Sequence, residues 1–149
     1  MIKIMFVCHG NICRSPMAEF VMKNIVRMNG DGGNFYICSA ATSNEEIGHD
    51  IHRGTKNILK VNNIPFHRRE AVRLTKSDYE KFDLIIGMDR YNVQNILRIF
   101  GDDPEEKVHL LLSFADIDRS VDDPWYTNDF ETTYNDILIG CTALYNKLK

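Results

Sequence analysis

Cys8 and, six positions later, Arg14 carry the clearest chemical signal in the sequence. The stretch between them contains Gly10 and Asn11, an apolar and β-prone run over residues 2–7 precedes it, and a helical pattern follows it. Backbone N–H groups in a turn between a strand and a helix can converge on an oxyanion, and the positive end of the helix dipole adds to their attraction. The guanidinium of Arg14 can grip two oxygens of a phosphate group at once. The segment therefore predicts a pocket for a tetrahedral oxyanion with a thiol beside it.

The same electric field would act on the thiol of Cys8. A helix N-terminus and a nearby arginine both favour the thiolate, so we expect the pKa of Cys8 to lie below the value of about 8.5 for a free thiol. The alternative is that Cys8 is a small buried hydrophobe and Arg14 a surface cation. The strand–turn–helix setting favours the reactive site, because such a motif is convincing only in that context.

A second cluster, Asp123-Pro124-Trp125-Tyr126, lies near the other end of the chain. If Cys8 attacked phosphorus, the departing aryloxide or alkoxide would need a proton, and Asp123 is the candidate donor. Pro124 restricts the backbone of Asp123 to extended conformations and helps to aim its carboxyl group. Trp125 and Tyr126 offer ring faces on which an aromatic leaving group could stack. Taken alone the cluster is also typical of a turn with core aromatics, whereas beside the Cys8 loop it supplies the complementary catalytic role.

Strand-like and helical segments alternate along the chain, and this pattern predicts the fold. Ser15 is expected to be a helix N-cap with Pro16 at the first helical position, and residues 116–129 are expected to form a long polar loop. The alternation predicts a single α/β domain over residues 1–149, in which a central four-stranded parallel sheet lies between helices in a three-layer α/β/α arrangement. The active-site loop would follow the first strand, at the edge of the sheet where such folds bind ligands. We expect strands over residues 2–7, 35–40, 84–88 and 108–112. Helices are expected over residues 16–28 and 52–61, in a short capped segment from about residue 75, and from about residue 130 to the C-terminus. A further helix would be capped by Asp89, run to about residue 100 and be ended by Gly101.

Composition excludes several classes of function. The chain has 149 residues and a formal net charge of −3, so it shows no basic footprint for nucleic acid. Its apolar runs are far shorter than the roughly 20 residues that span a bilayer, so we expect no membrane segment. Four irregularly spaced cysteines without an export signal favour reduced thiols and a cytoplasmic location.

Residues 7–16, Val-Cys-His-Gly-Asn-Ile-Cys-Arg-Ser-Pro, resemble the signature of the low-molecular-weight protein tyrosine phosphatases. Residues 123–126 resemble the general-acid loop of that family, and the resemblance covers essentially the whole chain. Three intermediate stretches also fit its pattern, namely residues 39–43, 73–75 and 88–92. The family resemblance implies hydrolysis of phosphotyrosine in proteins and of small aryl phosphates.

The resemblance also implies roles for the central residues. Cys8 would attack phosphorus in line and form a phosphocysteine intermediate, while Arg14 and the loop N–H groups would hold the equatorial oxygens. Asp123 would protonate the leaving phenolate and then deprotonate the water that hydrolyses the intermediate. Ser15 would hydrogen-bond the Cys8 thiolate. Neither a metal ion nor an organic cofactor is implied, and phosphate would be both product and inhibitor.

Further residues follow from the same resemblance. Asn11 would hold the loop in shape through a left-handed backbone conformation, supported by Ser39 and a nearby histidine, for which His67 is the natural candidate. Cys13 would form a reversible disulfide with Cys8 that protects it from irreversible oxidation, or it would simply be a packed loop residue. The implied substrate-binding residues are His9, Gly10, Asn11, Ile12, Cys13, Arg14, Trp125 and Tyr126.

Three other functions are compatible with parts of the sequence. Arsenate reductases share the Cys8–Arg14 spacing but need further paired cysteines, which Cys38 and Cys141 do not provide. Protein-arginine phosphatases typically carry threonine where this chain has Ile12, which favours phosphotyrosine here. A phosphotyrosine-binding module would be expected to lack the nucleophile, the arginine or the acid. The family resemblance places the loop after the second strand at the pocket rim, where vertebrate members often carry an aromatic residue and this chain has Asn44-Glu45-Glu46. Glu45 would either repel acidic flanks of a peptide or be solvated.

Overall fold

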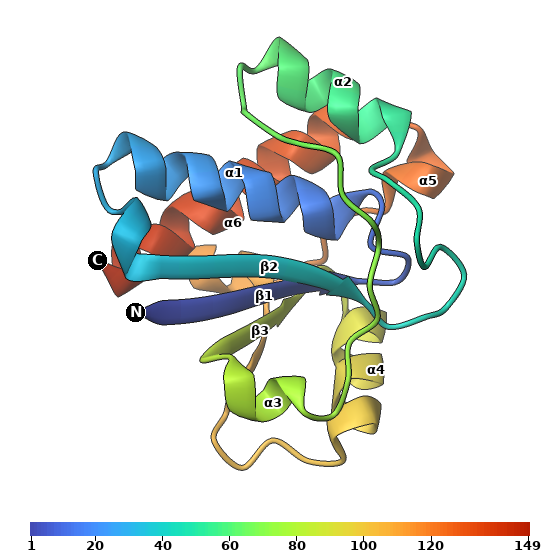
Figure 1. Cartoon of the computed structure of the whole chain (residues 1–149), viewed down its shortest axis with the longest axis vertical. Helices are drawn as coiled ribbons and strands as arrows, with labels where there is room; N and C mark the ends of the chain where they lie inside the picture. The colour runs from blue at the N-terminus through green and yellow to red at the C-terminus, as the bar shows by residue number, and fades with distance from the viewer.

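The computed structural model describes residues 1–149 and shows strands and helices alternating around one parallel sheet (Figure 1). The sheet has the strand order β2-β1-β3-β4, and each neighbouring pair is parallel. In chain order the elements are β1 (Ile2–Cys8), α1 (Arg14–Met28), the 3₁₀ turn η1 (Gly32–Asn34), β2 (Phe35–Ala41), α2 (Arg53–Val61), α3 (Asp78–Lys81), β3 (Leu84–Gly87), α4 (Arg90–Phe100), β4 (Val108–Leu110), the 3₁₀ turn η2 (Leu111–Ala115), α5 (Pro124–Thr127) and α6 (Phe130–Leu148).

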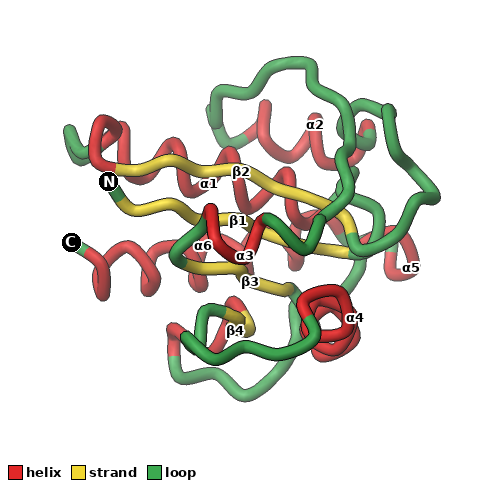
Figure 2. The backbone as a smooth tube through the Cα atoms, turned by 60° about the horizontal axis from the view of Figure 1, so that its bottom comes forward, coloured by secondary structure: helices red, strands yellow, loops and turns green.

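Helices cover both faces of the sheet, which confirms the predicted three-layer α/β/α fold. Helices α1 and α6 lie together on one face, with α2 beyond them, and α3 and α4 lie on the other (Figure 2). The N- and C-termini lie at the same end of the molecule, opposite the carboxyl ends of the strands (Figure 1). The loop after β1 is therefore at the edge where this class of fold binds its ligands.

The central strand β1 shows why the sheet needs helices on both sides. Ile4 and Phe6 pack into the cluster formed with α1 and α6, while Met5 and Val7 pack into the cluster formed with α3 and α4. Successive side chains of a strand point to opposite faces, so a strand buried on both sides is apolar at nearly every position. The continuous apolar run thus fixes the position of β1 and of the loop that follows it.

Helix α1 begins earlier than predicted, and Ser15 is not its cap. The helix starts at Arg14, Cys13 occupies the cap position, and no side chain caps the first turn. The hydroxyl of Ser15 instead faces the sulfur of Cys8 at 3.0 Å. Pro16 is still tolerated, because the first backbone N–H groups of a helix have no partner within the helix. Because Ser15 does not cap α1, its hydroxyl is available to the loop around Cys8.

The second half of the chain departs from the prediction in two places. Strand β4 ends at Leu110, and the next five residues form η2. The expected loop over residues 116–129 contains the short helix α5, whose first turn is capped by Asp123. By contrast, Asp89 caps α4 with a capping box as expected, and Gly101 ends that helix with a positive φ of 91°.

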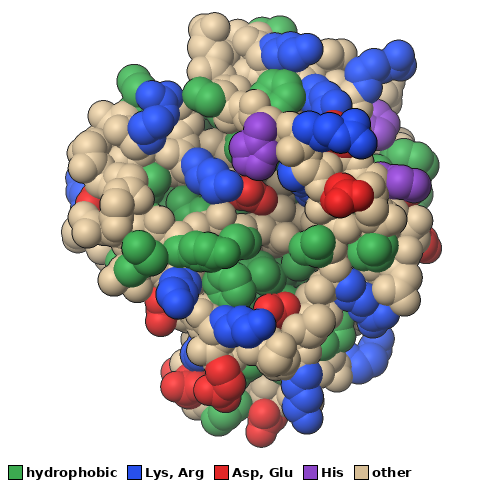
Figure 3. Space-filling view, in the orientation of Figure 1, with side chains coloured by type: hydrophobic (Ala, Val, Ile, Leu, Met, Phe, Trp, Pro, Cys, Tyr) green, Lys and Arg blue, Asp and Glu red, His purple; other side chains and the backbone are tan.

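Strand β2 forms one edge of the sheet, and the side chains around it lie at the molecular surface. Hydrophobic side chains gather across the middle of this face, with Lys, Arg, Asp and Glu above and below them (Figure 3).

No helix of the chain has the length and apolarity needed to cross a bilayer.

Candidate active site

The loop between β1 and α1 wraps around the sulfur of Cys8. Asn11 has a left-handed backbone with φ of 60°, as its residue type predicts. The backbone N–H groups of Asn11 and Ser15 point at the Cys8 sulfur at 3.3 and 3.4 Å, and the Ser15 hydroxyl lies at 3.0 Å. Donors directed at a sulfur favour its negatively charged form, which is the nucleophilic one. The loop therefore places three groups that can donate hydrogen bonds around the Cys8 sulfur.

The side chain of Asn11 organises the hydroxyl groups around the loop. Its amide nitrogen donates to the Ser15 hydroxyl at 2.7 Å and to the Ser39 hydroxyl at 2.9 Å. Because the Ser15 oxygen accepts from Asn11, its own hydrogen is free to point at Cys8. Ser39 in turn donates to the buried carboxylate of Glu19 at 2.6 Å. The predicted support by Ser39 is thus present, with Glu19 behind it.

Arg14 is buried and is held by residues from two later segments of the chain. One guanidinium nitrogen donates to Asp89 at 2.7 Å and to the carbonyl of Val121 at 2.9 Å. Burial lowers the pKa of Arg14, but the negative charges of Cys8, Asp123 and Asp89 outweigh it, so the pKa is raised and the side chain stays cationic. The sequence predicts Asp89 only as a helix cap. The second carboxylate oxygen of Asp89 accepts the hydrogen bond from Arg14 and so orients the guanidinium.

Asp123, which lies near the other end of the sequence, is beside Arg14 in the folded chain. One carboxylate oxygen accepts the backbone N–H of Trp125 at 3.0 Å, which fixes the carboxyl group as the cap of α5. The other oxygen lies 3.4 Å from the second terminal nitrogen of Arg14. The structure therefore brings the predicted nucleophile, anion clamp and acid together, although more than 100 residues separate Arg14 from Asp123.

These groups surround one small pocket of about 100 Å³. Its rim includes Glu45, which pairs with His9 at 3.0 Å, and Glu46, whose side chain packs over Gly10. A Cβ atom at Gly10 would lie 3.3 Å from Glu46, so the glycine makes room for this rim. Every predicted substrate-binding residue except Asn11 lines the pocket; Asn11 supports it from behind. The lining consists of Cys8, His9, Gly10, Ile12, Cys13, Arg14, Glu45, Glu46, Asp123, Trp125 and Tyr126.

Residues 3–149 match the family model described as low molecular weight phosphotyrosine protein phosphatase. The chain belongs to this family. The match over nearly the whole chain confirms the family that residues 7–16 and 123–126 indicate.

Individual relatives give the same picture. The low molecular weight protein-tyrosine-phosphatase PtpA of Staphylococcus haemolyticus is 41% identical over 146 residues, which are 97% of this chain and 92% of that protein. The crystal structure of a low molecular weight protein tyrosine phosphatase from Streptococcus pyogenes is 43% identical, with a TM-score of 0.90, and the match covers 100% of this chain and 94% of that one. YfkJ from Bacillus subtilis is 35% identical with a TM-score of 0.96, and the match covers 99% and 94% of the two chains.

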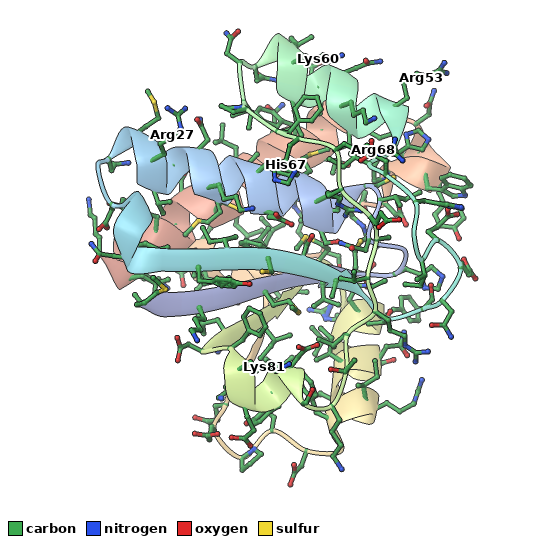
Figure 4. The ribbon with its side chains drawn as sticks, in the orientation of Figure 1. Arg27, Arg53, Lys60, His67, Arg68 and Lys81 are labelled. Carbon is green, nitrogen blue, oxygen red and sulfur yellow. The ribbon has the colours of Figure 1, made fainter.

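The histidine predicted to support the loop of this phosphatase is not there, so the prediction for His67 is wrong. His67 lies over α1, where its ring meets the edge of Phe20 at 5.1 Å and its Nδ1 contacts the carbonyl of Arg68 (Figure 4). No hydrogen bond joins it to Asn11 or Ser39. The chain between α2 and the sheet first crosses α1, which carries His67 away from the loop.

Arg69 supports the loop instead. Its guanidinium donates to the backbone carbonyl of Asn11 and to that of His49, the latter at 3.3 Å, and its own N–H donates to Asp50 at 3.1 Å. A loop whose N–H groups point inward must direct carbonyls outward, and a buried polar group left without a partner costs about 1–3 kcal/mol. Burial lowers the pKa of Arg69, yet an arginine remains charged at neutral pH.

Replacing Arg69 by methionine is expected to lower kcat about tenfold or more, since a hydrogen bond from a charged group is worth about 1.5–3 kcal/mol. KM should change less, because the anion contacts of Arg14 remain. Steady-state kinetics on phenyl phosphate checks this, with Arg68→Met as the matched neighbour. Equal activity in both variants and the wild type would show that catalysis does not depend on Arg69.

Asp50 anchors Arg69 and also pairs with Lys56 at 2.6 Å. Burial raises the pKa of Asp50, but hydrogen bonds from Lys56 and from the backbone N–H groups of Arg69 and Ile51 outweigh it and lower the pKa to about 2. The folded pKa is thus below the value of 3.8 for an unperturbed carboxyl group. The stabilisation is therefore fully present above about pH 4 and is lost as the pH falls toward 2.

Asp50→Asn is accordingly expected to lower the free energy of unfolding by about 1 kcal/mol at pH 7, after allowance for solvent screening. The deficit should shrink as the pH falls below about 4. Urea unfolding of both proteins at a series of pH values measures this difference. A deficit that is constant or grows on acidification contradicts the predicted sign.

Cys13 lines the same pocket, but its environment differs from that of Cys8. Burial, followed by the negative charges of Cys8 and Asp123, raises the pKa of Cys13 to about 12, so it is a thiol at neutral pH. All four cysteines are unpaired. The reversible disulfide between Cys8 and Cys13 stays a prediction.

Proposed function

We propose that the protein hydrolyses phosphotyrosine in proteins and small aryl phosphate monoesters through a phosphocysteine intermediate. The observation that carries this proposal is the convergence of the Cys8 sulfur, the buried Arg14 guanidinium and the Asp123 carboxyl on one pocket. These groups have complementary roles in cleaving a phosphate ester, and the family of the chain is one of phosphotyrosine phosphatases.

In the first step, the Cys8 thiolate attacks phosphorus in line with the leaving oxygen. The P–O bond to the aryl group breaks as the S–P bond forms. Arg14, fixed from behind by Asp89, and the loop N–H groups hold the three equatorial oxygens while charge redistributes among them. Since Arg14 is already buried and oriented, little reorganisation is needed when the phosphate arrives.

Asp123 supplies the proton that the departing phenolate needs. In the second step the carboxylate takes a proton from water, which attacks the phosphocysteine and releases phosphate. The Ser15 hydroxyl donates to the Cys8 sulfur as it leaves. Inorganic phosphate fits the same contacts and is expected to inhibit competitively.

The pocket wall favours an aromatic leaving group. Trp125 and Tyr126 are 58% and 83% exposed, yet both line the pocket. Rings at the mouth of a narrow anion site can stack on a phenyl ring that follows the phosphate. Ile12 lies in the same lining and gives it apolar surface rather than an additional hydroxyl group.

Asp123→Asn tests the acid. The variant should lose about 10²- to 10³-fold in kcat/KM with phenyl phosphate, and much less with p-nitrophenyl phosphate, whose phenolate needs no proton to leave. This ratio reports the steps up to phenol release, so the second-step role of Asp123 as a base does not enter it. Equal losses on both substrates would contradict the role of Asp123 as general acid.

Substrate class is tested by measuring phosphate release from phosphotyrosine and phosphoarginine side by side. Turnover of phosphotyrosine alone supports the proposal. Preference for phosphoarginine would move the activity to phosphoramidate hydrolysis, and release from neither would leave a binding role for the pocket.

A further inference from the structure

His52 connects three parts of the molecule that meet at the active site. Its backbone N–H donates to the carbonyl of Ile12 in the anion loop at 2.8 Å. Its Nδ1 accepts the N–H of Gly54 at 3.0 Å and caps α2. Its ring stacks on Phe130, with the centroids 5.3 Å apart and an interplanar angle of 15°, and it meets Trp125 nearly at a right angle at 5.7 Å.

Two structural features fix the position of the Phe130 ring against His52. Phe130 is the first residue of α6, so its backbone is fixed by that helix. A Cβ atom at Gly54 would lie only 2.3 Å from the Phe130 ring. The ring therefore occupies space that only a glycine leaves free. His52 is held between this ring and the capped first turn of α2, which makes it a rigid support.

The Trp125 side chain makes one aromatic contact and no side-chain hydrogen bond. It is 58% exposed on the four-residue helix α5, and His52 is the only aromatic ring that pairs with it. Trp125 also follows Asp123 within two positions, and its backbone N–H binds the Asp123 carboxylate at 3.0 Å. An indole ring that rotated freely could not form a fixed wall of the pocket.

We infer that His52 is a positioning residue that holds Trp125 as the wall on which an aryl leaving group stacks. The inference rests on the proposed function and deepens it, because it names the residue that makes the site prefer aryl over alkyl phosphates. His52 does not line the pocket and makes no hydrogen bond to Asp123. It acts through the orientation of the indole.

Two substitutions separate the ring of His52 from its capping role. His52→Asn keeps an acceptor for the cap of α2 and removes the ring. His52→Phe keeps a ring for Phe130 and Trp125 and removes the acceptor. The backbone bond to Ile12 is common to both. With phenyl phosphate, KM should rise about two- to tenfold in H52N, the range expected for a lost aromatic pair, and stay near the wild-type value in H52F. The inhibition constant of inorganic phosphate, which has no ring, should not change in either variant.

Fluorescence gives a readout that does not depend on activity. Trp125 is the single tryptophan of the chain, so emission reports on this one ring. In H52N the emission anisotropy should fall and acrylamide should quench more strongly, whereas H52F should behave like the wild type. In a Trp125→Ala background, adding H52N should have no further effect on KM, because the two residues act as one unit.

Unchanged KM and unchanged quenching in H52N would overturn the inference. A matching rise in the phosphate inhibition constant would also overturn it, since His52 would then act through the anion loop. If H52N does not fold, His52→Leu, which keeps an apolar contact with Phe130, provides the same comparison. Failure of the wild type to cleave phenyl phosphate would instead refute the proposed function, while the fluorescence result would still decide the role of His52.

Discussion

Cys8→Ser is expected to abolish turnover of phosphotyrosine, with a loss of about 10⁴-fold or more, as when the nucleophile of a covalent mechanism is removed. A serine hydroxyl at this position would have to lose a far less acidic proton than a thiol does. The groups in contact with this position, namely two backbone N–H groups and the Ser15 hydroxyl, are hydrogen-bond donors rather than bases. The loop, however, should keep its shape, because Asn11 and Ser15 remain. We therefore expect the variant to bind inorganic phosphate while it fails to turn over ester. Phosphate release and phosphate binding, measured on the same preparation, check both statements.

Cys13→Ser is the matched control, since both cysteines line the pocket but only Cys8 receives the donors of the loop. It should keep most of the activity. Substantial activity in Cys8→Ser, or a comparable loss in Cys13→Ser, would contradict the assignment of the nucleophile.

Arg14→Lys is expected to lower kcat about 10³-fold although the charge is kept, a loss similar to that from removing an oxyanion-hole donor. Arg14 is 2% exposed and donates at once to Asp89 and Val121, with its second nitrogen left to face the phosphate and Asp123. An ammonium group is a point charge that cannot reproduce this planar fork. Steady-state kinetics on phenyl phosphate measures the loss.

Arg90→Lys provides the control for this substitution. Arg90 lies next to Asp89 in the chain, but it is exposed and pairs with Asp118 on the surface. It should keep wild-type kinetics, because exposed ion pairs contribute little. A loss of less than tenfold in Arg14→Lys would show that charge alone, rather than bidentate geometry, stabilises the transition state.

The order of strands and helices was predictable because local signals agree with the tertiary structure. The apolar run of β1 is buried on both faces, and Asp89 with Gly101 delimits α4 as expected. The Cys8 loop was predictable for the same reason, since its residues are contiguous and the strand before it fixes their place. Asn11 takes the left-handed backbone that its residue type allows.

Contacts between distant segments were not predictable in this way. Arg69 rather than His67 reaches Asn11, because the path of the chain over α1 decides which side chain faces the loop. Asp89 carries a strong capping signal that hides its second role toward Arg14. Helix α5 is one turn long and has no periodicity to detect. Each of these features depends on tertiary neighbours that no local pattern encodes.

The most direct test of the mechanism is mass spectrometry of the protein quenched in acid during turnover of an aryl phosphate. The expected result is a peptide containing Cys8 that carries one additional phosphoryl group, which is absent from Cys8→Ser and still present in Cys13→Ser. A phosphoryl group on another residue, or complete turnover with no phosphorylated protein at any quench time, would contradict a phosphocysteine intermediate at Cys8.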